Sequence, residues 1–236
     1  MRLVAATTNS QDNMPRHRKL TRSFYDRPTL EVAPDLLGKY LKFASSQRVL
    51  SARIVEVEAY IGEEDPACHA ACGLTARNRI MYGPPGFAYI YFIYGMYYCL
   101  NFVTEQQGSP AAVLIRAAEP DEGFCTLQLE RRHGKSEHLL TGPGKLCREF
   151  GLSSRHNGLD LTGRQLYLED RGCLAPNIRC STRIGIRKGA DKLWRFFDGD
   201  SAAVSSKKTA SHVFQGSAIG VEAVAGVEMG MRKLHV

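Results

Sequence analysis

The chain has 236 residues, 44% of them hydrophobic, which is enough to bury one sizeable core. Its 31 Lys and Arg residues outnumber its 24 Asp and Glu residues, and the net charge is +7 at pH 7. A basic balance favours a polyanionic partner such as nucleic acid, although charge alone also fits an ordinary basic protein. No apolar run approaches the roughly 18 residues that a membrane helix needs, so we expect no membrane partner.

The first residues and the cysteines indicate the compartment. The short apolar start, Met1 to Ala6, is followed at once by polar residues, which excludes an ordinary secretory signal. The seven cysteines are an odd number scattered through the chain, a pattern typical of reduced thiols rather than of a disulfide framework. We therefore expect an intracellular protein.

The first half of the chain predicts an arm, a helix, a strand and a loop region. Residues 1–19 are polar and end in a basic run, so they predict a mobile basic N-terminal arm. Pro34 to Leu41 predicts a short helix that begins at Pro34. Arg48 to Tyr60 predicts a strand, and the Gly- and Pro-rich stretch from Ile61 to Gly86 predicts loops.

The segment 87–103 predicts a β-hairpin that turns at Tyr94 and Gly95. Side chains alternate with a period of two along each strand, and the tip carries Tyr94, Met96 and Tyr97. Aromatic rings on a protruding turn suit stacking on unpaired bases or wedging between stacked ones. The alternative is a hydrophobic hairpin buried against a helix.

The second half mixes strands and helices. Ala111 to Arg116 predicts a strand, Glu119 to Glu122 predicts the start of a helix, and another helix begins near Pro143 and runs through Phe150. Short β segments follow at Gln165 to Glu169, Arg183 to Arg187 and Trp194 to Phe197. This mixture favours an α+β fold over a doubly wound sheet: one mixed domain with a curved, largely antiparallel β-sheet and surrounding helices.

The strand Arg53 to Tyr60 carries two glutamates that could act in chemistry. By alternation, Ile54, Glu56, Glu58 and Tyr60 face one way, while the intervening Val and Ala residues face the core. Same-face neighbours lie about 7 Å apart, so the two carboxylates lie side by side. A solvated strand face is the alternative, and the spacing alone leaves Glu56 and Glu58 as rivals for an active role.

Two further motifs do not fit the sites they superficially suggest. Cys68 and Cys72 have a C-x₃-C spacing without a second ligand couple, so we expect no zinc site. The stretch Thr141 to Leu146 lacks the Gly and the Ser/Thr that a phosphate loop requires. Lys145, at a helix start, could still contact a phosphate.

These motifs together resemble the alkyladenine (methylpurine) DNA glycosylase family. The resemblance rests on a set of segments in one order over roughly residues 20–206: Arg53-Ile-Val-Glu-Val-Glu58-Ala-Tyr60, His69, Arg77-Asn-Arg79, the hairpin Tyr89 to Asn101, Leu114-Ile-Arg116-Ala-Ala-Glu-Pro120, Gly142-Pro-Gly-Lys-Leu-Cys147, Arg183-Ile-Gly-Ile186 and Trp194-Arg-Phe-Phe197. It implies a glycosylase domain over residues 20–206. Residues 207–236 match nothing in the family, and we expect a flexible tail.

The resemblance implies a monofunctional DNA glycosylase that starts base excision repair. Such enzymes flip 3-methyladenine, 7-methylguanine, hypoxanthine or ethenoadenine out of duplex DNA and hydrolyse the N-glycosidic bond. The implied partner is double-stranded DNA with damaged purines, bound by a monomer close to chromosomal DNA. No lysine lies in the pocket motif, so no lyase step is expected, and no metal or organic cofactor is implied.

The resemblance also assigns roles by position. Tyr60, His69 and Tyr91 match the walls that stack on the flipped base, and Asn101 matches a residue that crowds the 2-amino group of guanine. The hairpin is implied to insert into DNA: Tyr94 matches the residue that fills the gap left by the flipped nucleotide. The tip residues Gly95, Met96 and Tyr97, together with Lys145, complete the expected DNA contacts.

For catalysis, Glu58 matches the general base that holds the attacking water, so Glu56 is left a supporting role. Arg116 and the carbonyl of Val204 match two further contacts to that water. This chain has Ala202 and Ala203 where family members often have Pro-Trp, which bears on the position of Val204. The rival functions are a non-catalytic reader of damaged DNA and an RNA-acting N-glycosyl hydrolase; Glu58 and Arg116 together weigh against the reader.

Overall fold

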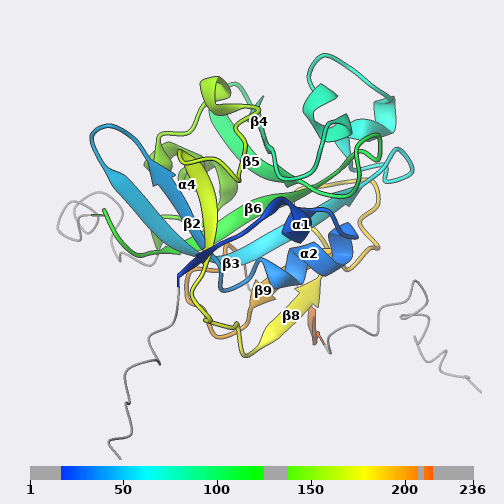
Figure 1. Cartoon of the computed structure of the whole chain (residues 1–236). Helices are drawn as coiled ribbons and strands as arrows, with labels where there is room; N and C mark the ends of the chain where they lie inside the picture. The colour runs from blue at the N-terminus through cyan, green and yellow to red at the C-terminus, as the bar shows by residue number, and fades with distance from the viewer. Residues whose placement is uncertain (1–16, 125–137, 207–209, 215–236) are drawn as a thin grey trace, which may run out of the picture.

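The computed structural model describes residues 17–124, 138–206 and 210–214. They form an α+β fold with one large antiparallel sheet and few helices, as predicted, although the sheet is not strongly curled (Figure 1). The described strands are β1 (Arg18–Lys19), β2 (Tyr40–Ala44), β3 (Val49–Ile61), β4 (Ala88–Ile93), β5 (Tyr97–Val103), β6 (Ala111–Pro120), β7 (Leu166–Asp170), β8 (Ile178–Ser181), β9 (Arg195–Asp198) and β10 (Ser211–Val213). The described helices are α1 (Arg22–Tyr25), α2 (Thr29–Asp35) and α4 (Pro143–Phe150), with short 3₁₀ turns η1 (His69–Cys72), η2 (Arg79–Tyr82) and η4 (Ser154–His156).

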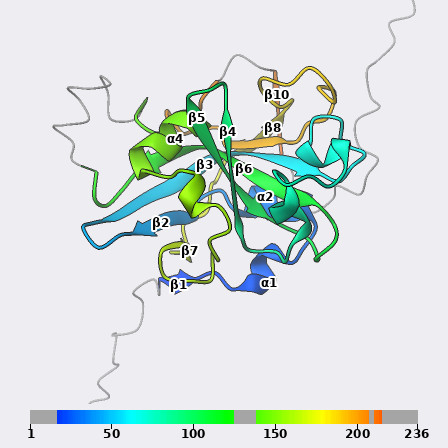
Figure 2. The same cartoon turned by 90° about the horizontal axis from the view of Figure 1, so that it is seen from above.

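The strand order along the sheet is β1-β7-β2-β3-β6-β5-β4, and β9, β8 and β10 join it in that order through β3. Within the expected N-terminal arm, Arg18–Lys19 pair with β7, and residues 1–16 lie outside the described residues. Within the expected C-terminal tail, Ser211–Val213 pair with β8, and residues 207–209 and 215–236 lie outside. Seen from above, β3 and β6 cross the centre of the molecule (Figure 2).

β3 contains a bulge that decides which way its side chains point. Its register with β6 shifts on either side of Glu56. Ile54 pairs with Ala118 and Glu56 pairs with Ala117, so two residues of β3 are matched by one residue of β6. A bulge breaks strict alternation. Ile54 therefore packs in the main core beside Val57, and Val55 packs in a separate small cluster. The prediction that Ile54 shares the face of the glutamates is wrong for this reason.

The main core lies between the sheet and the helices. α2 packs on β3 and β6, and α4 packs on β5 and β6. Their apolar sides enter one cluster with the strands, through Val32 and Leu36 of α2 and Leu146 and Phe150 of α4. This layer covers one face of the central strands, and the opposite face is available for a functional site.

The predicted helix from Pro34 to Leu41 is wrong. The helix is α2, which has Pro34 in its last turn, and the chain reverses at Gly38, whose φ of 83° suits glycine. Leu41 then pairs with Ala52 of β3 in the sheet. Cross-strand pairing of buried residues has outweighed the local helical pattern.

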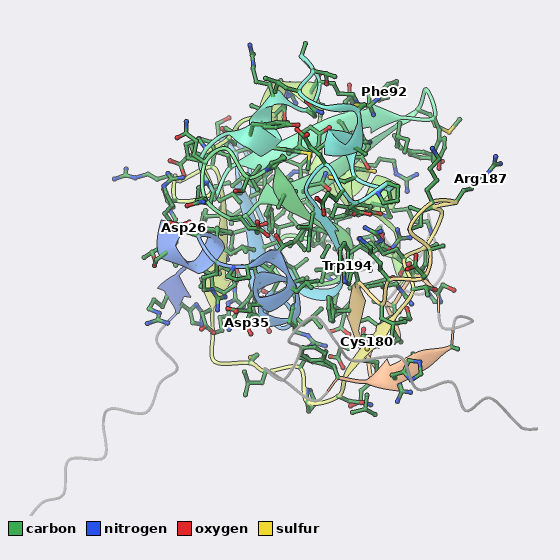
Figure 3. All side chains as sticks on the ribbon, turned by 90° about the vertical axis from the view of Figure 1, so that its right-hand side faces the viewer. Asp26, Asp35, Phe92, Cys180, Arg187 and Trp194 are labelled. Carbon is green, nitrogen blue, oxygen red and sulfur yellow. The ribbon has the colours of Figure 1, made fainter. Side chains whose placement is uncertain are left out.

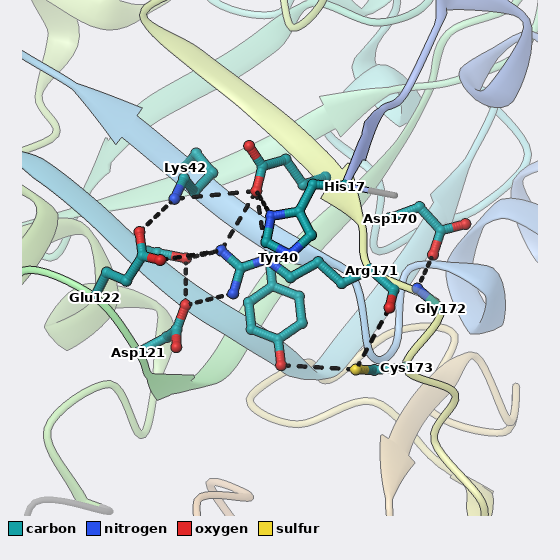
Figure 4. Close-up of polar contacts among 11 residues, drawn as sticks. His17, Tyr40, Lys42, Asp121, Glu122, Asp170, Arg171, Gly172 and Cys173 are labelled. Carbon is teal, nitrogen blue, oxygen red and sulfur yellow. Dashed lines mark hydrogen bonds and ion pairs between the residues drawn. The ribbon is translucent and has the colours of Figure 1, made fainter. Parts of the chain in front are cut away.

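The predicted helix start at Glu119 to Glu122 is also wrong within the described residues. β6 continues to Pro120, and the acidic side chains after it form ion pairs with β2 and the end of β7 (Figure 4). Lys42 Nζ lies 2.7 Å from a Glu122 oxygen, and Arg171 Nη1 lies 2.9 Å from Asp121. The carboxylates that suggested a helix N-terminus thus bind a cation of β2 and a cation that directly follows β7 instead.

Candidate active site

A cavity of about 510 Å³ lies on the face of the four strands β3, β6, β5 and β4 that is turned away from α2. The strands supply side chains two residues apart, and three loops close the rim. It is lined by Tyr60, Ala67, His69, Met81, Tyr89, Tyr91, Ile93, Tyr94, Tyr97, Cys99, Asn101, Ala112, Leu114, Arg116, Gly142, Pro143, Gly144, Lys145, Arg148, Ile184, Gly185 and Ile186.

The β4–β5 hairpin is confirmed, and its tip is exposed. Tyr94 and Gly95 both have positive φ, 55° and 66°, and the Met96 amide donates to the Ile93 carbonyl. The Tyr94 residue is 76% exposed and Met96 is 65% exposed. A bulky residue in this backbone region is strained, and such strain concentrates at functional sites. Tyr97 lines the cavity and is the least exposed of the tip's large side chains.

One wall of the cavity is aromatic and rigid. The His69 and Tyr91 rings lie 4.4 Å apart at 74°, and His69 Nδ1 lies 2.8 Å from the Tyr89 hydroxyl. Burial, and next the charge of Arg77, lower the pKa of His69 from 6.5 to about 4, so its ring is neutral at pH 7. Burial raises the pKa of Tyr89 to about 12, which keeps its hydroxyl protonated.

Tyr60 and Asn101 come from the strands beneath. Burial, and next the neighbouring Glu58 carboxylate, raise the pKa of Tyr60. Asn101 is 4% exposed, and its Nδ2 donates to the backbone carbonyl of Tyr89 at 3.0 Å. The bond fixes the amide group at the cavity wall, because rotating the amide would leave its buried N–H without an acceptor.

Glu58 lies under the cavity and is fully buried. Its Oε2 accepts from the Tyr60 hydroxyl at 2.9 Å and lies 3.2 Å from Arg116 Nη1. Its Oε1 accepts from the backbone N–H of Ile184 at 2.7 Å. Tyr60, Arg116 and Ile184 all line the cavity, so this carboxylate is held directly behind its surface.

Glu56 is fully buried as well, but its hydrogen-bond partners Arg195 and Ser205 lie away from the cavity lining. Its Oε1 accepts from Arg195 Nε at 2.7 Å and from the Ser205 hydroxyl at 2.8 Å, and its Oε2 accepts from the Ser205 amide at 2.6 Å. Arg116 Nε lies 3.3 Å from Glu56 Oε1, so Arg116 links the two carboxylates. Burial alone would lower the pKa of Arg116, but the charges of Glu58 and Glu56 outweigh it and raise that pKa.

The remaining expected residues lie at the edges. Val204 is buried beside Ser205 and is not part of the cavity lining, so among the described residues it belongs to the surroundings of Glu56. Lys145 stands at the start of α4 and lines the cavity with an exposed side chain. The cavity therefore does contain a lysine, which the pocket motif of the sequence lacks.

The comparisons with known proteins agree on one family. The family model described as "Methylpurine-DNA glycosylase (MPG)" matches residues 23–202. The chain belongs to the methylpurine-DNA glycosylase family. Membership makes it an N-glycosyl hydrolase of the DNA-repair class that deals with alkylation damage.

Relatives of similar length support the assignment. A 3-methyladenine DNA glycosylase, so named, from Methanocella arvoryzae is 51% identical over 193 residues, which cover 80% of this chain and 96% of that protein. Proteins that carry the same activity in their names are 51% identical in Wolbachia pipientis wMel, over 75% of this chain and 89% of theirs, and 48% identical in Alkaliphilus oremlandii, over 80% of this chain and 100% of theirs.

The structure of this glycosylase adds residues to the site that sequence reasoning did not single out. Cys99 and Leu114 line the cavity on the same strand faces as Asn101 and Arg116, and strand register could have indicated them. Ile184 was placed in a predicted strand from Arg183 to Arg187. That prediction is wrong: the strand is β8, which ends at Ser181, and the following loop closes the cavity (Figure 3 labels Arg187, which projects from it).

The described part of the chain contains neither a metal-binding cluster nor a membrane-spanning helix. In residues 17–124, 138–206 and 210–214, no three His, Cys, Asp or Glu side chains gather as a metal-binding group. Across the same part of the chain, no helix combines the length and the apolar character needed to span a bilayer.

Proposed function

We propose that this glycosylase flips 3-methyladenine, 7-methylguanine, hypoxanthine or ethenoadenine out of duplex DNA and hydrolyses its N-glycosidic bond with a water activated by Glu58. The observation that carries the proposal is the buried network of Glu58, Tyr60 and Arg116 directly behind an aromatic cavity. A cavity of about 510 Å³ also has room for a purine.

In this proposal, the base stacks between Tyr60 on one side and His69 with Tyr91 on the other. The T-shaped packing of His69 against Tyr91 holds that wall in one geometry. Electron-poor purines are attracted to aromatic faces as a cation would be. The Asn101 side chain excludes guanine because it crowds the 2-amino group of that base. The hydrogen bond from Asn101 to the Tyr89 carbonyl holds the side chain in this position.

In the chemical step, Glu58 accepts a proton from water as the oxygen bonds to C1′ of the sugar. The C1′–N bond breaks, and its electron pair leaves with the base. Arg116 and the Val204 carbonyl are the proposed further contacts to the water. Arg116 also forms ion pairs with both Glu58 and Glu56 and so holds the Glu58 carboxylate against the cavity wall.

The hairpin tip is the proposed DNA-inserting element. Tyr94 fills the space that the flipped nucleotide leaves, Gly95 permits the tight turn, and Met96 and Tyr97 border the lesion in the minor groove. Lys145 at the N-terminus of α4 contacts a phosphate, for which the exposed amine and the helix end are suited.

The product in this proposal is an intact abasic site. A Schiff-base nucleophile is activated by desolvation or by a second cation in a closed pocket. Lys145, the lysine of the cavity lining, has an exposed side chain and therefore lacks the first condition. Borohydride should trap no covalent complex with the DNA.

The test compares Glu58→Gln with Glu56→Gln in single-turnover base release from a duplex with one hypoxanthine. Glu58→Gln keeps the shape of the side chain and removes its basicity, so release should be abolished while duplex binding survives. Glu56→Gln should bind and retain measurable release. Near-normal release by Glu58→Gln beside an inactive Glu56→Gln would refute the assignment.

The same assay separates the rival functions. A non-catalytic reader of damaged DNA would bind the hypoxanthine duplex without releasing the base, even in the unsubstituted protein. An RNA-acting hydrolase would release bases faster from single-stranded RNA than from duplex DNA. We expect fast release from the duplex and slower release from both single strands.

A further inference from the structure

A buried ion pair behind the cavity is not used by the proposed mechanism. Both side chains of Asp65 and Arg183 are fully buried, and the two Arg183 Nη atoms lie 2.5 and 2.8 Å from the two Asp65 oxygens. Burial alone would raise the pKa of Asp65, but the hydrogen bonds and charge of Arg183 outweigh it and hold that pKa below its ordinary value. An isolated pair of this kind adds little to stability, because desolvation offsets most of the attraction.

The pair joins three segments that each carry a part of the site. Asp65 accepts from the Ala67 amide, two residues before His69. Arg183 Nη1 also donates to the backbone carbonyl of Ala59 at 2.9 Å, between Glu58 and Tyr60 on β3. Arg183 is therefore bound to the loop that bears one wall of the cavity and to the strand that bears the other.

The residue after Arg183 completes the connection. The Ile184 N–H donates to Glu58 Oε1 at 2.7 Å, so the position of that donor depends on where Arg183 is anchored. The guanidinium lies over the Tyr60 ring at 4.7 Å and over the Trp194 ring at 5.1 Å. It backs Tyr60, whose hydroxyl is the other neutral donor to Glu58.

The loop that follows Arg183 returns to the ion pair at Gly189. Gly189 has a φ of 60°, and its carbonyl accepts from Arg183 Nη2 at 3.1 Å. A Cβ at Gly189 would lie 3.1 Å from that nitrogen and 3.2 Å from an Asp65 oxygen. The chain thus passes close to the ion pair at a position where a side chain would disturb it.

We propose that Arg183 and Asp65 are positioning residues for hydrolysis: together they fix the Ile184 amide and Tyr60 on Glu58 and join the His69 loop to the same frame. The inference rests on the proposed function, because it assigns the pair through Glu58. Neither residue is part of the cavity lining, so neither is placed to contact the base or the water. Loosening the pair displaces Tyr60 and the Ile184 amide, two of the three donors to Glu58, and small displacements of a catalytic group lower the reaction rate strongly.

The experiment measures single-turnover base release from the hypoxanthine duplex as a function of enzyme concentration. Arg183→Lys keeps the charge but cannot bind Asp65 through two nitrogens while holding the Ala59 carbonyl. We expect the saturating rate constant to fall about 10- to 100-fold, while the concentration for half-saturation changes by less than about threefold. Asp65→Asn, which keeps the shape, should show the same separation.

Arg53→Lys is the matched control. Arg53 lies on β3, the strand that carries Glu58 and Tyr60, and its guanidinium also binds carboxylates through several nitrogens, those of Glu119 and Asp198, away from the cavity. We expect a comparable loss of melting temperature with an unchanged rate constant. At saturating enzyme, the rate constant is that of the enzyme–DNA complex, so an unfolded fraction of the enzyme does not lower it.

The outcomes are distinct. Unchanged rate constants in Arg183→Lys and Asp65→Asn overturn the inference, as does an equal fall in Arg53→Lys, which would indicate a general effect of stability. Failure of both variants to fold also overturns it, because the pair would then serve folding and not position. Failure of the proposed function appears separately, as absent release by the unsubstituted protein or as full activity of Glu58→Gln.

Discussion

Removing the Asn101 side chain should admit undamaged guanine to the cavity. To accept guanine, the unsubstituted protein would have to rotate the Asn101 amide away from the Tyr89 carbonyl, to which it donates at 3.0 Å. Breaking that bond leaves the buried amide N–H without its acceptor, which costs about 1 to 3 kcal/mol. At about 1.4 kcal/mol per factor of ten, this corresponds to a discrimination of about 5- to 140-fold.

The assay is single-turnover release of guanine opposite thymine, where the mismatch makes flipping easier, beside release of hypoxanthine. In Asn101→Ala, the rate of guanine release should rise by a factor that lies within the range of discrimination given above. Hypoxanthine has no 2-amino group, so the rate of its release should change far less. Asn101→Ser is a smaller truncation that keeps a polar group and should show the same direction. A site specific by obstruction gains substrates when the obstruction is removed.

A structural role for Asn101 predicts the opposite result. The buried amide would then serve only to satisfy a backbone carbonyl, and its loss would lower stability by about 1 to 2 kcal/mol with no new substrate. Melting temperatures measured on both variants identify that case. Continued rejection of guanine by a well-folded Asn101→Ala protein would refute the reasoning.

Three further outcomes are expected. Tyr94→Gly should slow base release while the free energy of unfolding stays within about 1 kcal/mol of its original value, because relief of the strained φ offsets the added chain entropy; equal release rates would contradict the wedge role. The pKa of His69 is lowered to about 4, so below pH 6.5 the unfolded chain binds a proton at His69 that the folded chain does not, and the free energy of unfolding falls as the pH drops from about 6.5 towards 4. In urea titrations, the free energy of unfolding of His69→Gln should therefore fall by about 1 kcal/mol less between pH 7 and pH 5 than that of the unsubstituted protein. This figure is reduced because His69 is partly exposed. Duplex affinity should weaken steeply with salt, and a flat plot of log K against log salt concentration would exclude binding through several phosphates.

Local pattern was sufficient to predict the parts of the molecule whose partners are close in sequence. The hairpin of β4 and β5 follows from alternation on both sides of Tyr94 and Gly95, and the exposed tip follows from the hairpin. The same holds for β3 and for α4, which begins at Pro143. In each case the neighbouring residues that fix the element lie within a few positions along the chain.

The predictions of secondary structure fail where residues far along the chain determine the local conformation. The acidic run after β6 would suit a helix start, but Lys42 and Arg171 bind it from other strands. Arg183 belongs to no strand, because its guanidinium is bound inward by Asp65, 118 residues away. These partners cannot be identified from the residues that lie next to the acidic run or next to Arg183.

The rivalry of Glu56 and Glu58 shows the same limit within the site. Alternation places both on one face, and both do reach Arg116. What differs between them is supplied from far along the chain: Arg195 and Ser205 bind Glu56, whereas the Ile184 amide binds Glu58. The family resemblance selects Glu58, but spacing along β3 alone could not.

The energetics of this cluster favour a chemical explanation for its presence. Glu56, Glu58 and Arg195 are fully buried and Arg116 is nearly so, and burying charges costs several kcal/mol per ion before pairing returns part of it. Apolar residues of similar size would generally stabilise the same strands as well or better. Glu56 and Arg195 bind each other; Glu56 also accepts from the Ser205 amide, and Arg195 donates to the Ser206 carbonyl. These contacts compensate the burial of the two charges and shape the loop after β9. Glu58 instead shares Arg116 with Glu56 and takes its other donors from the cavity lining, an arrangement that fits the proposed role of this carboxylate in accepting a proton from water.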